Sequence, residues 1–189
     1  METIALGKYL TLGDFCTCTQ TYKKYFPKID PFPKNPETIE AIKALNQIII
    51  EPIIDHFGQD KFNLTYGFCS PDLKRYLNQK DPLTGKKNGR IDPTRDQHMS
   101  YEINRRGNYY CSRLGAACDF MILDFDSDRL VDWILSQKLP FDSLYFYDKN
   151  RPIHISYGYQ NKRDIWTFNQ TGQPTKKGIS NWLNLAKEI

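Results

Sequence analysis

The sequence predicts an α+β fold with a mainly antiparallel central sheet and helices packed on it. Helical spacing of apolar residues dominates the first half of the 189-residue chain, strand-like segments gather in the second half, and short links join neighbouring strands. Hydrophobic residues make up 40% of the chain, which is enough for a folded core. We therefore expect a single α+β domain over residues 36–189, preceded by an irregular N-terminal arm over residues 1–35.

The first clear helix should follow the prolines that end this arm. Asn35 is a suitable N-cap, and Pro36 fits the first turn, where its missing N–H would have no helical partner anyway. Pro52 should kink this helix or start a second piece, which Gly58 should end. His56 falls in that piece and is expected to be an ordinary packing or surface residue. The apolar stripe consists of Ile39, Ile42, Leu45, Ile48 and Ile49.

A strand, a short helix and a long loop should come next. Residues 62–68 alternate between apolar and polar side chains, which predicts a half-buried strand. Ser70 and Pro71 are suited to the start of a short helix. Residues 79–95 form the longest polar stretch and carry five basic side chains between turn signals. We interpret them as a solvated loop, with contact to phosphate groups as the alternative.

The remaining strands lie in the second half of the chain. Asp119 interrupts an apolar run over residues 117–125 that suits a buried strand, and Ser127 should open an amphipathic helix. Residues 143–147 and 153–157 flank a polar turn, which predicts a hairpin. The last expected elements are a strand over residues 164–168 and a closing helix over residues 178–187.

Composition limits the class of protein. The net charge of +4 is mildly basic and does not by itself indicate nucleic-acid binding. The longest apolar run, at residues 48–50, meets Glu51 at once, so we expect no membrane contact. The N-terminus lacks the pattern of a secretory signal. Five cysteines without such a signal are expected to be reduced thiols, which predicts a cytoplasmic protein.

Two histidines and an aspartate carry the strongest chemical signal. His154 sits between two isoleucines that should anchor its strand in the core, so the imidazole should face the other side. The Asp119 carboxylate needs a cation or several donors to offset its burial. With His98 they form a set that suits catalytic Zn²⁺ and leaves a position for a water whose pKa falls to about 7. The alternative is that Asp119 is an ordinary ion-pair partner of Arg113 or Arg151.

Other residues are candidates for catalysis and for substrate binding. A helical turn at residues 98–103 would place Glu102 on the same face as His98, so Glu102 or Asp148 could move protons. Arg151 is the third candidate for the catalytic group. The candidate substrate contacts are Arg113, Tyr147 and Ser156, of which Ser156 shares the strand face of His154.

These residues resemble a family, the LAS-type zinc metallopeptidases, which include D-Ala-D-Ala carboxypeptidases and phage endolysins. The family motif Ser-x-His-x-x-Gly-x-Ala-x-Asp is similar to Asp96-Gln97-His98 followed by Gly115-Ala116-Ala117-Cys118-Asp119. The later family histidine is similar to His154 in Pro152-Ile153-His154-Ile155-Ser156. The resemblance spans roughly residues 10–157. It implies the hedgehog/DD-peptidase fold, zinc held by His98, Asp119 and His154, and cleavage of an amide or peptide bond in a small peptide or other amide substrate.

The chain departs from the family pattern at three points. Residues 99–114 form an insertion between His98 and Gly115, and an alignment without this gap would put Ser112 in place of the histidine. The family's catalytic acid corresponds to Arg151, and its substrate-binding arginine corresponds to Cys69.

Two other functions therefore stand beside the hydrolase. A divergent member could bind an anion such as a nucleotide or nucleic acid through Arg113 and Arg151, because guanidinium groups match phosphate oxygens. A protein-interaction module without chemistry is the third possibility. It would use exposed tyrosines of the late strands.

Overall fold

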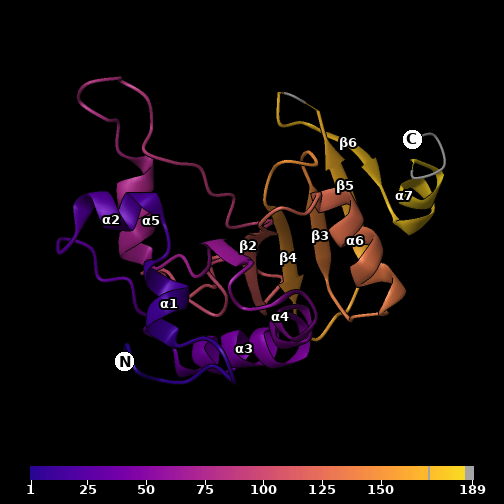
Figure 1. Ribbon diagram of the computed structural model, residues 1–189. Coiled ribbons are helices and arrows are strands. Elements are labelled where there is room, and N and C mark those ends of the chain that lie inside the picture. Colours follow the sequence, from indigo (N-terminus) through magenta and orange to yellow (C-terminus); the bar gives the residue numbers. More distant parts are fainter. Residues whose placement is uncertain (170, 186–189) are drawn as a thin grey trace.

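A computed structural model describes residues 1–169 and 171–185, and its centre is a six-stranded sheet (Figure 1). The strand order is β1-β2-β4-β3-β5-β6, and in the described chain every neighbouring pair is antiparallel except β3 and β5. The fold class is therefore α+β as expected, with a mixed sheet. The strands are β1 (Phe62–Tyr66), β2 (Ala116–Ile122), β3 (Ser143–Phe146), β4 (Ile153–Tyr157), β5 (Asp164–Phe168) and β6 (Pro174–Lys177).

Helices cover one face of this sheet. The helices α3 (Pro36–Leu45) and α6 (Ser127–Ser136) contact the central strands. The strand residues in the same core cluster alternate along the sequence, as in Cys118 and Phe120 of β2 or Ile153 and Ile155 of β4. Since neighbouring residues of a strand point to opposite faces, the intervening Asp119 and His154 lie on the face away from these helices.

The predicted long helix is divided into three pieces. The Asn35 side chain accepts the N–H of Glu37 at the start of α3, and Gly58 follows the end of α4 (Glu51–Phe57), as the sequence predicted. Between them lies a π-helical segment, η1 (Asn46–Ile50). Pro52 has no N–H to donate to the preceding turn, and the wider π-helical turn is the kind of adjustment that proline induces. His56 stacks on Trp133 with ring centroids 4.7 Å apart, which makes it a packing residue.

Part of the N-terminal segment, residues 1–35, belongs to the core rather than lying over it. They contain α1 (Leu12–Thr17) and α2 (Gln20–Tyr25), and Thr11 and Asp14 form a capping box at the start of α1. Leu12 and Phe15 are fully buried in the same cluster as the strand residues. The expectation of an irregular arm missed this, because α1 is too short for its apolar periodicity to stand out.

The remaining elements lie at the two ends of the molecule. Ser70 caps α5 (Pro71–Asn78) as expected, and the following loop extends away from the body beside α2 and α5 (Figure 1). Strand β6 was not predicted. α7 is described over Ile179–Leu185, and the predicted end at Lys187 lies outside the described residues. Among the described residues no helix combines the length and apolarity needed to cross a membrane.

Candidate metal centre

Four side chains lie in one row across the sheet. Asp119 on β2 is paired with Tyr66 on β1 and with His154 on β4, and His154 is paired with Tyr145 on β3. Residues directly opposite each other in antiparallel strands point to the same face. The Tyr145 ring stacks on the His154 imidazole with centroids 4.5 Å apart, which fixes the plane of that imidazole.

His98 reaches this row from a loop. Its Nδ1 lies 2.7 Å from the backbone carbonyl oxygen of Gly67, and its own carbonyl accepts the N–H of Cys69 at 2.9 Å. A carbonyl can only accept, so Nδ1 carries a proton, and Nε2 is the ring nitrogen that faces the row. Gly67 is needed here, because a Cβ at this position would lie 2.1 Å from the carbonyl oxygen of Phe15.

The three predicted ligands converge. Asp119 Oδ1 lies 3.2 Å from His98 Nε2 and 2.8 Å from His154 Nδ1, and the three ligand atoms lie within 4.8 Å of one another. A tetrahedral Zn²⁺ with bonds of about 2.0–2.1 Å would space its ligands about 3.3 Å apart. The donor types suit zinc, and the two separations that involve Asp119 Oδ1 are close to this spacing. Ser112, the alternative to His98, is an exposed residue.

Electrostatics couple the three groups. Burial alone would raise the pKa of Asp119, but the neighbouring imidazoles outweigh it and hold that pKa well below its usual range. Burial lowers the pKa of His154, whereas at His98 the attraction of Asp119 overcomes burial and raises the pKa. The site therefore holds an ionised carboxylate between two imidazoles, which is the protonation state of the carboxylate that a cation requires.

The cluster is closed on the histidine side and open at the carboxylate. The side chains of His98 and His154 are 4% and 1% exposed, whereas that of Asp119 is 28% exposed. His154 Nε2 is buried and has no hydrogen-bond partner among the described residues. A partly open three-ligand set matches catalytic zinc sites better than the closed four-ligand sites that only stabilise a fold.

Glu102 does not share a helical face with His98. Residues 98–101 form a turn in which Ser100 has a φ of 48°, so the expected helical turn is wrong. Glu102 is 2% exposed, and its Oε1 accepts hydrogen bonds from the start of α3. The donors are the backbone N–H groups of Lys34 and Asn35 and the Thr38 hydroxyl. The Glu102 carboxylate therefore holds the loop that follows His98 against the start of α3.

Two of the predicted substrate contacts are engaged in internal hydrogen bonds. Arg113 donates to the carbonyl of Arg95 at 2.7 Å and to Ser143 Oγ at 2.6 Å. The Ser156 hydroxyl is buried and accepts the backbone N–H of Ser143 at 3.1 Å. Both side chains join segments around β3, which leaves them less capacity to bind a ligand.

The third predicted contact lies close to the open side. The half-buried Tyr147 has a pKa raised by burial and by the nearby Asp119 carboxylate. The Arg151 guanidinium lies 5.1 Å from the centre of the Tyr147 ring. Asp148 is exposed in the turn between β3 and β4, where it accepts the N–H of Asn150.

Asp96 is a further carboxylate near this site, and no catalytic or binding role was predicted for it. Burial raises the pKa of Asp96, while both imidazoles act to lower it, so Asp96 lies within electrostatic reach of His98 and His154. Its Oδ1 accepts the N–H of His98 at 3.3 Å. Its place two residues before His98 was the available signal.

Comparison with known proteins adds no relative. Neither a family model, nor a curated protein, nor a solved structure matches this chain.

Proposed function

We propose that this protein is a zinc-dependent hydrolase that cleaves an amide or peptide bond in a small peptide or other amide substrate. One observation carries the proposal: two imidazole nitrogens and a carboxylate oxygen lie within 4.8 Å of one another at a partly open position on the sheet. This donor set, open on one side, is typical of hydrolytic zinc enzymes. The resemblance to LAS-type metallopeptidases supports the same chemistry.

A hydrogen bond and a stacked ring orient the two histidines without any metal. Gly67 fixes the tautomer of His98, and Tyr145 fixes the plane of His154. His98 Nε2, Asp119 Oδ1 and His154 Nδ1 would hold the ion. Zn²⁺ in such a site polarises a carbonyl group and lowers the pKa of a coordinated water to about 7.

The reaction also needs a group that accepts and returns a proton. Glu102 is engaged at α3 through Oε1, and two other carboxylates are therefore the candidates for this role. Asp96 Oδ1 accepts the N–H of His98 at 3.3 Å, and Asp148 directly follows Tyr147 in the sequence. Asp96→Asn and Asp148→Asn separate these roles, because the variant that removes the proton carrier should lower kcat while zinc stays bound.

Zinc content and hydrolysis test the proposal together. Protein purified without chelator should contain one zinc per chain, and dialysis against a chelator should remove any peptidase activity until zinc is restored. Asp119→Asn should abolish zinc binding. Asp124→Asn is the matched control, because Asp124 is exposed with a φ of 61°, a conformation that Asn tolerates. Absence of zinc from the wild-type protein, together with no gain of hydrolysis on adding it, would refute the hydrolase.

A further inference from the structure

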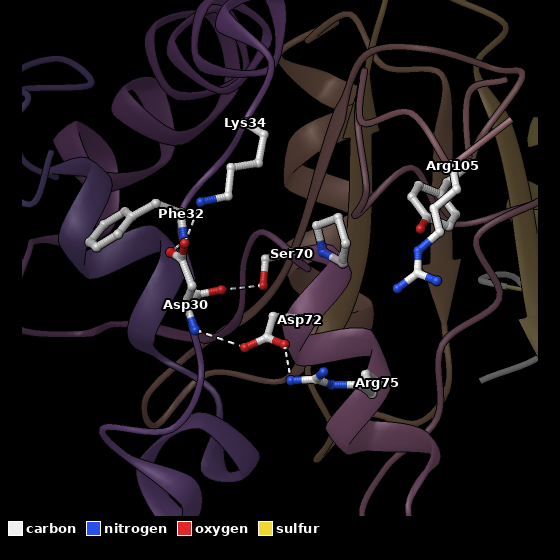
Figure 2. A pocket seen from close by; sticks show the side chains of 9 residues that line it. Asp30, Phe32, Lys34, Ser70, Asp72, Arg75 and Arg105 are labelled. Atoms are coloured by element: carbon white, nitrogen blue, oxygen red, sulfur yellow. Dashed lines mark hydrogen bonds and ion pairs between the residues drawn. The ribbon is translucent and has the colours of Figure 1, made fainter. Parts of the chain in front are cut away.

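A cavity of about 310 Å³ is lined by none of the three candidate metal ligands (Figure 2). Its three walls are the N-terminal segment at residues 30–34, the start of α5, and the loop at residues 105–110. This volume is at the lower end of the range for small-molecule sites. Phe32, Pro71 and Tyr110 provide apolar surface. The cavity can therefore take a molecule with a small apolar body, provided that its polar walls suit the ligand's charge.

The side chains that line the cavity carry more positive than negative charges. Two carboxylates line the cavity, and each is already neutralised: Lys34 pairs with Asp30, and Arg75 pairs with Asp72 at 2.5 Å. Arg105 lines the cavity as well, and no carboxylate of the described chain forms an ion pair with it. One positive charge is thus left uncompensated. Figure 2 shows the Arg105 guanidinium across the opening from Asp30 and Asp72.

Hydrogen bonds join the three walls to one another. The Ser70 hydroxyl donates to the carbonyl of Asp30 at 2.7 Å, and Asp72 accepts the N–H of Asp30 at 3.0 Å, which ties the N-terminal segment to α5. Glu102 accepts the N–H of Lys34 at 3.1 Å, which ties the same segment to the third wall. The cavity walls are therefore held in place without a ligand, so little ordering is needed when a ligand binds.

The turn that carries Arg105 is also constrained. Asn104 Oδ1 accepts the N–H of Arg106 at 2.8 Å, and the carbonyl of Glu102 accepts the N–H of Tyr110 at 3.0 Å. The backbone beside the cavity is fixed, while the long Arg105 side chain is exposed and keeps its donors available.

We propose that this cavity binds a small organic oxyanion, a carboxylate or a phosphate monoester on an aromatic body. The oxyanion pairs with the Arg105 guanidinium, whose planar fork matches two oxygens of either group. The ring packs on the apolar surface that Pro71 and Tyr110 provide. The site does not depend on the metal centre or on the proposed hydrolysis, since none of the three metal ligands lines the cavity.

Titration with phenyl phosphate and benzoate tests the proposal and tells the two oxyanions apart. Binding is followed by calorimetry and by NMR shifts of the Tyr110 ring signals in the wild-type protein. At least one anion should bind with those shifts, and neutral benzyl alcohol should bind about tenfold more weakly or worse. Arg105→Gln should weaken anion binding by roughly tenfold or more, since a charge-assisted hydrogen bond is lost.

Arg106→Gln is the matched control. Arg106 is adjacent, equally charged and exposed, but it does not line the cavity, so its loss should change affinity less than twofold. If both variants weakened binding equally, the anion would be held only by general electrostatic attraction to the basic surface, and the proposal would be overturned. So would tighter binding of benzylamine than of either anion. Binding that persists in zinc-free Asp119→Asn would confirm a site separate from the metal centre, whether or not the protein is a hydrolase.

Discussion

Asp119 and His154 face each other across strands β2 and β4, with Oδ1 and Nδ1 2.8 Å apart. The pair is built on two regular strands, and only His98 comes from a loop. The candidate metal centre should therefore keep most of its geometry when loops are altered, and lose it when a strand residue of the set is changed.

Replacing a single ligand should remove the metal. We expect His98→Gln to lower zinc affinity by about a hundredfold or more, because two remaining ligands cannot hold the ion tightly. His56→Gln is the matched control, since His56 stacks on Trp133 on the helical side of the sheet. Competition with a chromophoric chelator measures both affinities. Equal zinc affinity of the two variants would contradict the assignment of His98.

Glu102 should matter for stability. Glu102→Ala removes the acceptor for three donors around the start of α3, and we expect a loss of about 3 kcal/mol in the free energy of unfolding. Glu40→Ala, on the exposed side of α3, should cost less than about 0.5 kcal/mol. Urea denaturation compares them. A loss as small as that of Glu40→Ala would show that Glu102 does not anchor the loop.

Gly115 should be irreplaceable for steric reasons. Its φ is 108°, and a Cβ would lie 2.4 Å from the carbonyl oxygen of Tyr157, so we expect Gly115→Ala to cost about 3 kcal/mol or more. Gly85 also has a positive φ, of 64°, but no atom lies within 4 Å of its would-be Cβ. Gly85→Ala should therefore cost only about 1 kcal/mol. Thermal unfolding should reproduce this order.

Alkaline pH should destabilise the metal-free protein through Cys69. Burial raises the pKa of this thiol from 9.0 to about 12. Below pH 9 the thiol is protonated in both the folded and unfolded states, so its contribution is fully present. As pH rises from 9 toward 12 the unfolded thiol ionises first, and the contribution is lost. Cys69→Ala should show a shallower decline of unfolding free energy over this window, whereas an unchanged slope would mean that the thiol ionises freely in the folded state.

Local patterns were sufficient for much of the fold. Asn35, Pro36 and Pro52 marked the start and the division of the helix, because capping and the missing proline N–H are effects of neighbouring residues. The period of two in a strand placed His154 away from the core side, and the structure brings it together with Asp119.

Features that depend on distant contacts were not predictable in this way. Glu102 has its partners at residues 34–38, a separation that no local pattern reveals. The parallel pairing of β3 with β5 and the short strand β6 depend on how the chain crosses the sheet. Asp96 lies near the candidate site because the turn at residues 97–101 brings His98 to the strands, and no local pattern predicts that turn.

Tyr66, Asp119, His154 and Tyr145 lie in one row across four strands, so metal binding at the candidate site would depend on the correct pairing of those strands. A slip of β4 by one residue would turn its imidazole toward the helices and offer an isoleucine to the ion instead. A chain with misaligned strands could not assemble the site, so an ion that binds only the correctly threaded sheet would favour that threading over its competitors.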